Sequence, residues 1–412
     1  MEEILSAAKK ETQALEEILS RAKKVAEEAE VFMVSSEDTS VQFETNRLKH
    51  VQSKQSVSVS LRVIKKGRIG YATATTLDNA QELVNNAVET AQFGQKAEFQ
   101  FPALTPYHRF RIFDASVAKV SPETMTGLGE KMIAKVLKHT PGLLCEGGVG
   151  RSTTTVSLMN SRGGQAKYKE SHFSLGIEAQ LVRDTDMLFV GESESSCRPI
   201  LETEAITKVI LRQLDQAKVQ ASVRTKSMPV VFTTQGVASA LISPLMAAFN
   251  GKTVLEGASP IGNKLGQLVF DKSFSLHDDP TISYRPSTRP CDDEGVPSQR
   301  TPLIKRGVVS NFLYDLQTAG LAKTQSTGNG NRGRGAMPAP SPSAFIITPG
   351  KTTFDEMVSD IKEGLVVEQL MGATQGNVLG GDFSGNVLLG YKIENGKIVG
   401  RVKDTMVSGN IY

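Results

Sequence analysis

The five histidines of this 412-residue chain are the first candidates for metal chemistry: His50, His108, His139, His172 and His277. Zinc hydrolases commonly carry two histidines four residues apart on a helix, with a glutamate beside one of them as the base. None of the five is followed by glutamate, and no two lie within thirty residues of each other. A local zinc motif is therefore absent. A site assembled from distant residues stays open, with His277 beside Asp278 and Asp279 as its first candidate, although such a histidine is more often an ordinary hydrogen-bonded residue.

The three cysteines, Cys145, Cys197 and Cys291, are far apart and odd in number. Their spacing excludes a disulfide framework or a CxxC metal knuckle and favours a reducing compartment. Cys291 precedes the acidic run Asp292–Gly295. A cysteine nucleophile needs a base within hydrogen-bond reach, and the sequence shows none, so an acidic turn is the simpler interpretation.

A glycine-rich segment, Gly328-x-Gly330-x-x-Gly333, matches the dinucleotide fingerprint by letter. That fingerprint needs a strand before it and a helix after it. The segment Ala336–Pro342 contains three prolines and cannot be helical, which excludes this function. Two interpretations remain: a flexible loop, or an extended loop whose exposed N–H and C=O groups line a peptide cleft. Arg332 and Arg334 could receive a carboxylate there or be solvated.

Charge and hydropathy narrow the function classes. The chain carries 47 Lys+Arg and 44 Asp+Glu, a net charge of +3. Nucleic-acid binders usually show a basic excess or stripe, so DNA binding is disfavoured. The charged N-terminus has no apolar segment of a signal peptide, and no apolar run approaches the ~18 residues of a membrane helix. We expect a cytoplasmic protein that contacts neither nucleic acid nor membrane.

Hydrophobic periodicity predicts the same order of elements twice in residues 1–224. An amphipathic helix over 3–29 precedes strands at 31–34, 41–45, 56–64 and 69–75, and then a helix over 79–93 with Asp78 as N-cap and Gln81 at the capping-box position. The second unit has a helix from Pro122 to about 139, strands at 143–144, 153–158, 172–183 and 187–190, and a helix over 203–219. We infer a duplicated helix–β-meander–helix unit, about 1–96 and 116–222, forming either two sheets or one layer.

Composition changes after Lys226 towards Gly, Pro, Ser and Thr. We expect a buried strand near 229–232, a helix over 235–250 kinked or started at Pro244, and a helix near 352–363 capped at Thr353. Short strands are expected at 268–270, 308–313, 344–348 and 386–393. The predicted fold class is α+β, with an N-terminal α/β domain (1–224) and a mainly β C-terminal domain (225–412).

Several motifs resemble one family in order along nearly the whole chain. Gly364–Gly372 resembles the "GLVV-x-x-LMG" segment of TldD/PmbA proteins, and Gly381–Ser384 with Gly390–Ile398 resembles their "GDYS" and "GFWVENGEI". Val407–Asn410 resembles "IAGN". The run Asp292–Gly295, the pair Thr327-Gly328 and the early segment Phe43–Lys49 fit as well.

The family contains two kinds of chain. TldD-type chains carry an HExxxH helix and a C-terminal cysteine that bind zinc, and PmbA (TldE)-type chains lack them. The corresponding stretch here is Ala238–Ala248, where every ligand position is apolar, small or hydroxyl-bearing. None of these side chains suits zinc, which prefers His, Cys or carboxylate. The chain therefore resembles the PmbA (TldE) type, with no catalytic residue and no metal of its own, and zinc expected in a TldD-type partner.

The resemblance implies a cytosolic two-subunit peptidase with an α/β N-terminal half and a largely β C-terminal half. The TldD-type chain hydrolyses, and the TldE-type chain completes a cavity that admits unfolded peptides, such as peptide-antibiotic precursors or an antitoxin. The label "modulator of DNA gyrase" stems from that biology and not from DNA contact. The expected partner is a TldD-type subunit or a second copy. Candidate contacts with a bound peptide are Gly328, Asn329, Gly330, Asn331 and Arg332.

Two alternatives stay open: a homodimeric peptide-binding or scaffold protein, and a stand-alone hydrolase using His277 or Cys291. One departure from the family is that PmbA-type chains usually continue some tens of residues past "GN", whereas this sequence ends at Tyr412. A strand or interface element is therefore expected to be missing.

Overall fold

A six-stranded antiparallel sheet is the backbone of the N-terminal half in the computed structural model, which describes residues 2–184, 186–333 and 337–412. The strand order is β3-β2-β1-β4-β5-β6. The strands are β1 (Glu28–Glu44), β2 (Arg47–Lys65), β3 (Arg68–Ala74), β4 (Leu144–Asn160), β5 (Gln165–Arg183) and β6 (Asp186–Ser196). Because β1 pairs with β4, the two meanders join into one continuous sheet. The duplicated unit is confirmed, and it forms one layer.

Strands β1 and β4 are longer than the periodicity indicated. Residues 31–34 and 41–45, expected as two short strands, lie in or at the end of β1, and 153–158 lies in the same strand, β4, as Leu144. Between them the sequence is polar or glycine-rich, so it carries no apolar alternation. These stretches are strands because both neighbouring strands satisfy their backbone groups.

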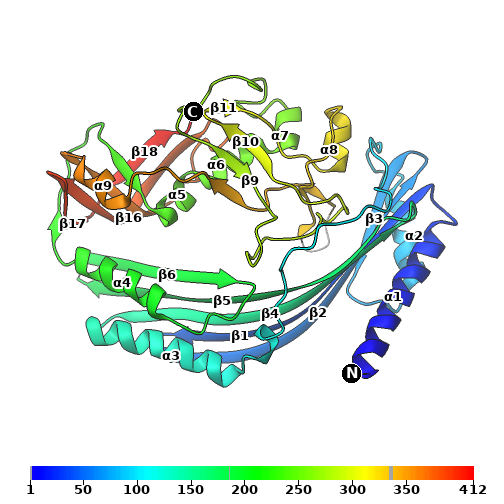
Figure 1. Ribbon diagram of the computed structural model, residues 1–412, viewed down its shortest axis with the longest axis horizontal. Coiled ribbons are helices and arrows are strands. Elements are labelled where there is room, and N and C mark those ends of the chain that lie inside the picture. Colours follow the sequence, from blue (N-terminus) through cyan, green and yellow to red (C-terminus); the bar gives the residue numbers. More distant parts are fainter. Residues whose placement is uncertain (1, 185, 334–336) are drawn as a thin grey trace.

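Four helices cover one face of this sheet: α1 (Glu2–Ala22), α2 (Ala80–Thr90), α3 (Pro122–His139) and α4 (Glu204–Gln216). Figure 1 shows α3 and α4 on the side of the sheet that faces away from the C-terminal half. Buried Leu15, Ile18, Leu83 and Val84 pack against β1 and β2. A larger core joins α3 and α4 to β4, β5 and β6. A 3-10 turn, Val117–Lys119, precedes α3.

Capping explains where these helices begin. Ser121 caps α3 by accepting a hydrogen bond from the backbone N–H of Thr124, with Pro122 at the first position, as expected. Helix α2 is capped by Asn79 instead of the predicted Asp78, because the Asn79 side chain accepts from the N–H of Glu82. The first helix ends at Ala22, earlier than predicted, since β1 begins at Glu28.

The C-terminal half contains two larger sheets and a two-stranded ribbon. One sheet has the order β7-β17-β16-β15-β8, with β18 also paired to β16. Its strands are β7 (Gln220–Ala221), β8 (Val230–Phe232), β15 (Glu363–Met371), β16 (Asp382–Glu394), β17 (Lys397–Val402) and β18 (Met406–Asn410). The other sheet, β11-β10-β9-β14, comprises β9 (Leu276–Asp278), β10 (Thr301–Lys305), β11 (Val308–Val309) and β14 (Phe345–Ile347). The ribbon pairs β12 (Gly330–Asn331) with β13 (Ala339–Pro340).

The described part of this half also contains five short α-helices: α5 (Thr234–Ala240), α6 (Ile242–Phe249), α7 (Gly251–Leu255), α8 (Leu316–Leu321) and α9 (Phe354–Ser359). The helix predicted over 235–250 is two helices that break at Leu241, three residues before Pro244. Thr353 caps α9 through a capping box with Glu356, as expected. The mixed α+β class with a sheet-rich C-terminal half is confirmed. Within the described part of the chain, no helix is both long and apolar enough to cross a membrane.

Candidate functional site: a groove on the helix-free face of the sheet

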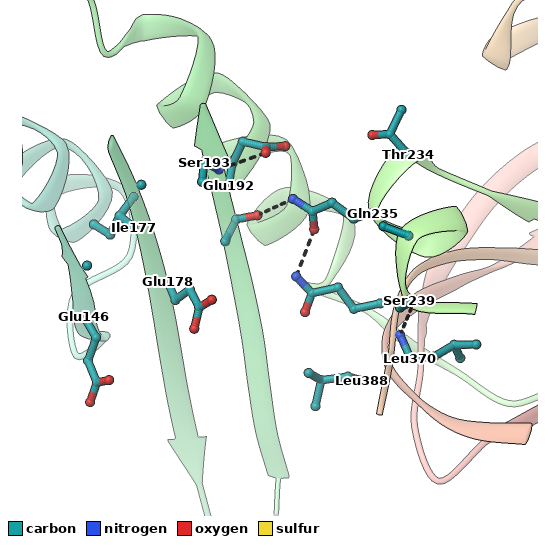
Figure 2. Close-up of a pocket in the computed structure, with 15 residues that line it drawn as sticks. Glu146, Ile177, Glu178, Glu192, Ser193, Thr234, Gln235, Ser239, Leu370 and Leu388 are labelled. Carbon is teal, nitrogen blue, oxygen red and sulfur yellow. Dashed lines mark hydrogen bonds between the residues drawn. The ribbon is translucent and has the colours of Figure 1, made fainter. Parts of the chain in front are cut away.

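The face of the six-stranded sheet without helices looks towards the C-terminal half, and cavities lie along it. The largest, with a volume of about 960 Å³, lies between β4, β5 and β6 on one side and α5, β15 and β16 on the other (Figure 2). We call it the wide cavity. Its charged side chains are Glu146, Glu178 and Glu192, one from each of the three strands.

Alternation along β5 connects the wide cavity to two others. Gly176 and Glu178 line the wide cavity, and His172 and Ser174 line a second cavity of about 520 Å³. Tyr168 and Glu170 line a third of about 280 Å³, which we call the inner cavity. Residues two apart on a strand share a face, so the three cavities follow one track. Ten residues at about 3.3 Å each make this track about 33 Å long, enough for an extended peptide.

The floor of the groove is made of small residues. Gly176 and Ser193 line both the wide and the second cavity, so these two are contiguous. A Cβ atom on Gly176 would lie 2.6 Å from the Cβ of Ser193, the residue paired with it on β6. No side chain fits at position 176 without displacing its neighbour. The glycine thus leaves the backbone of β5 open to a ligand lying along the track.

A glutamine bridge closes the edge of the sheet beside the wide cavity. Gln235 of α5 donates from Nε2 to the carbonyl oxygen of Gly191 on β6 at 3.2 Å, and its Oε1 accepts from Gln369 of β15 at 2.9 Å (Figure 2). On the same edge, the N–H of Gly191 donates to Gln213 Oε1 at 3.0 Å. Edge strands offer unpaired backbone groups to other chains, and here side chains occupy those of Gly191. The bridge also joins the two halves of the molecule at the groove.

At the far end of the track, a buried ion cluster joins the two halves. Arg62 of β2 contacts Glu30 of β1 at 3.1 Å and Glu294 of the C-terminal half at 2.6 Å, and Arg332 also pairs with Glu30. These four side chains are at most 2% exposed. Desolvation is the largest influence on Glu30 and raises its pKa despite the two guanidinium groups. Sequence reasoning missed this cluster, whose one signal was an arginine at position 62 within an alternating strand.

The glycine loop lies at this junction. Gly328, Asn329, Gly330 and Arg332 are buried, so the expectation of an exposed loop is wrong for them. Asn329 donates to Asp278 Oδ2 at 2.7 Å, and the N–H of Gly330 donates to Asp292 Oδ2 at 2.8 Å. These acidic partners hold the loop in place through side-chain hydrogen bonds.

Two of the five predicted loop residues nevertheless reach the groove. Asn331 is exposed and lines the inner cavity together with Arg332. Arg332 is not available to pair with a substrate carboxylate, since it already forms an ion pair with Glu30. Arg334 lies outside the described residues. Contact of the loop with a bound peptide therefore stays a prediction.

The two suspected catalytic residues lie apart from the wide cavity. His277 on β9 contacts Arg300 at 3.3 Å, and desolvation followed by this neighbouring charge lowers its pKa. Cys291 is 1% exposed, and burial followed by the charge of Asp292 raises its pKa well above the ordinary range. A thiol that stays protonated is a poor nucleophile. These surroundings disfavour a stand-alone hydrolase built on either residue.

Helix α5 borders the wide cavity, and it holds the first part of the stretch that resembles the zinc-binding helix of TldD-type chains. Thr234, Gln235, Ala238 and Ser239 of α5 line it. Residues 234–249 contain no histidine, cysteine, aspartate or glutamate, so they do not fit a zinc ion. In the ranges that the structure describes, no group of three or more such side chains is close enough to hold a metal.

Comparisons with known proteins agree on one family. Residues 225–412 match the model of the PmbA/TldA metallopeptidase C-terminal domain, and residues 29–91 match that of the PmbA/TldA metallopeptidase domain 1. An uncharacterised protein of Methanocaldococcus jannaschii is 28% identical, with 93% of this chain and 89% of that protein covered. Metalloprotease PmbA of Escherichia coli O157:H7 is 24% identical, with 93% and 84% covered.

Solved structures show the same fold. TldE from Thermococcus kodakarensis superposes with a TM-score of 0.88 at 22% identity, covering 97% of this chain and 91% of that one. A Thermotoga maritima protein named as a modulator of a DNA gyrase gives a TM-score of 0.86 at 22% identity, covering 96% and 92%. The matched domain models, the curated relatives and the shared fold together place this chain in the PmbA/TldD metallopeptidase family.

Proposed function

We propose that this chain is the non-catalytic, PmbA (TldE)-type subunit of a cytoplasmic metallopeptidase that processes or degrades unfolded peptides. The observation that carries the proposal is the wide cavity in front of α5. It is large, and the α5 side chains that line it are Thr234, Gln235, Ala238 and Ser239, none of which suits zinc. Relatives named metalloproteases support the reaction class.

In this function the groove holds substrate while the partner supplies the metal. An extended peptide needs backbone partners and room for its side chains. The track along β5 offers a glycine and serine floor, and Glu146 and Glu178 are exposed in the wide cavity. The zinc and the base that activates water belong to a TldD-type chain, and no hydrolytic step is assigned to residues of this chain.

Co-expression with a TldD-type chain tests this function. We expect a stable complex with one zinc per heterodimer, contributed by the partner, and cleavage of a reduced, carboxymethylated protein that neither chain cleaves alone. Zinc is counted by mass spectrometry on dialysed samples of each chain and of the complex. Failure to co-purify, together with no gain in cleavage, would contradict the proposal. About one zinc per isolated chain would make this chain an enzyme in its own right.

A homodimeric peptide-binding protein without a catalytic role is the second candidate. One observation is compatible with it: the α5 side chains in the wide cavity can contact a peptide and do not suit a metal, so the groove could bind a peptide without cleaving it. Light scattering of the isolated chain gives its oligomeric state, and a titration with an unfolded peptide, followed by a search for cleavage products, gives its activity. A dimer that binds peptide tightly and does not respond to a TldD-type chain would favour this candidate.

A further inference from the structure

The inner cavity has a different character from the rest of the groove. Strands β1, β4 and β5 form one wall, with Phe32, Val34, Thr154, Val156, Tyr168 and Glu170. The loops of the C-terminal half form the other, including Arg289, Asp293, Asn331 and Arg332. Its volume of about 280 Å³ suits the end of a chain or one side chain, and not a folded partner.

One carboxyl group in this cavity, that of Glu170, has no ion-pair partner among the described residues. Arg289 pairs with Asp293 at 3.5 Å between Nη1 and Oδ1, and it donates from Nη2 to Ser343 Oγ at 3.1 Å. Arg332 pairs with Glu30, behind the cavity wall. Both guanidinium groups of the lining are thus ion-paired, and Arg289 keeps Nε as a buried donor without a hydrogen-bond partner. Glu170 has neither a hydrogen bond nor an ion pair with any residue that the structure describes.

The position of Glu170 makes it the anion that faces the space. It lies on the groove face of β5, opposite Thr154 of β4. The side chain is half-buried, and desolvation, followed by the charge of Asp293, raises its pKa to about 7 against the pull of Arg289. Two other groups whose pKa values are raised stand next to it, Tyr168 and Cys197. A half-buried carboxyl group that faces a cavity and has no ion pair is suited to a ligand that brings a positive charge.

We propose that the inner cavity binds a primary ammonium group, the α-amino group of a peptide or the ε-amino group of a lysine side chain. This inference rests on the proposed function, because the groove brings the peptide to the cavity. An ammonium group has three donors. Three of the residues that line the space carry acceptor oxygens: Glu170, Thr154 and Asn331.

Other ligands fit the lining less well. A carboxylate or phosphate would face Glu170 and Asp293, and both arginines that could attract it already hold carboxylates. A metal ion needs several ligands at short range, and no group of three acidic, histidine or cysteine side chains among the described residues meets that requirement. A single monovalent cation with directional donors matches one free carboxylate.

Three dipeptide probes test the inference on the intact chain at pH 7: alanyl-alanine amide, N-acetyl-alanyl-alanine amide and N-acetyl-alanyl-lysine amide. Binding is followed by calorimetry or by NMR. We expect a probe with a free ammonium group to bind, and the acetylated probe without lysine to bind at least about tenfold more weakly, as for loss of one charge-assisted hydrogen bond. The two amine-bearing probes distinguish the amino terminus from a lysine side chain.

Two variants locate the binding. Glu170→Gln keeps the shape of the side chain and should reduce amine binding by about tenfold or more. Glu130→Gln removes one carboxylate from the exposed side of α3 and should change nothing. Equal binding of all three probes, no binding of any, or amine binding that survives Glu170→Gln would overturn the inference.

A longer unfolded peptide, acetylated and free of lysine, separates this inference from the proposed function. If it binds while the dipeptide probes bind equally with and without an amine, the peptide groove is supported and the ammonium site is contradicted. If it does not bind either, the peptide groove itself is contradicted.

Discussion

The two ends of the groove share strand β5 and differ in how they treat charge. In the wide cavity Glu146 and Glu178 are paired across β4 and β5, and both are exposed to solvent. At the inner end Glu30, Arg62 and Glu294 are buried, and Glu170 is half-buried. Two like charges opposite each other are tolerated where water screens them. Where water is excluded, each guanidinium group needs a carboxylate, and a surplus carboxyl group shifts its pKa.

The largest effect is expected at the buried cluster. Arg62→Ala leaves Glu30 without one of its two cations and Glu294 without its ion-pair partner in the interior. Removing one member of a buried ion pair typically costs about 3–5 kcal/mol, so the free energy of unfolding should fall by about that amount. Urea denaturation measures it. Arg21→Ala breaks an exposed pair with Glu17 and should cost less than about 1 kcal/mol. Similar losses in both variants would refute the contrast between buried and exposed charge.

Glu170→Gln should stabilise the protein, and more so at high pH. The pKa of Glu170 is about 7 when folded, against an ordinary value of 4.5, so the native state holds its proton more tightly than the unfolded state does. The stability from this group is therefore present below pH 4.5 and lost as the pH rises to 7. Glutamine does not ionise, so the variant does not lose this stability as the pH rises. The gain over wild type should be larger at pH 8 than at pH 5 by on the order of 2 kcal/mol.

Urea unfolding of both proteins at the two pH values checks this prediction. A gain that is the same at pH 5 and pH 8, or a loss at both, would mean that the pKa of Glu170 is not raised in the folded protein. Added alanyl-alanine amide should narrow the difference at pH 8, because a ligand that binds only the native state stabilises it.

Gly176→Ala tests the floor of the groove. The new Cβ atom would lie 2.6 Å from the Cβ of Ser193, so the strands must shift, and the expected cost is about 1–3 kcal/mol. Peptide binding should weaken as well. Gly127→Ala on α3 is the control: nothing lies within 4 Å of its new Cβ atom, and alanine favours a helix by about 1 kcal/mol. Thermal unfolding should therefore move in opposite directions for the two variants.

The smallest effect is expected from the glutamine bridge. Gln235→Ala removes the donor to Gly191 and the acceptor for Gln369, at a cost of about 1 kcal/mol. The bridge joins the two halves at the groove. The free energy of local opening at the edge of β6, measured by hydrogen exchange, should therefore fall by more than the free energy of global unfolding. Unchanged exchange around Gly191 would show that the bridge does not hold this edge.

Local patterns in the sequence predicted most of the elements. Apolar residues alternate with period two in residues 56–64 and 172–183, and they recur with the helical period in the helix after Ser121. These periods arise because one side of each element is buried and the other is more exposed. The breaks in β1 and β4 were predicted wrongly because strand continuity in Ser35–Ser40 and Gly147–Ser152 comes from pairing with neighbouring strands, and no side-chain pattern records it.

The candidate site was harder to predict than the fold. The glycine spacing led to the prediction that Gly328–Arg332 contacts a bound peptide. Most of that loop is buried against acidic residues from other segments. The residues that line the wide cavity, such as Glu146, Glu178 and Gln235, belong to elements whose sequences show only ordinary strand and helix patterns. Their chemistry depends on neighbours that are distant in the chain.

The sequence by itself determined the duplicated helix–meander–helix unit, the sheet-rich C-terminal half and the absence of zinc ligands from residues 234–249, because periodicity and ligand type are properties of local residues. Tertiary structure alone decided that the repeats share one sheet, that Arg62 meets Glu294 across 232 positions, and that Glu170 forms no ion pair among the described residues. The physical reason is that charge pairing and desolvation depend on distance in space, which separation along the chain does not specify.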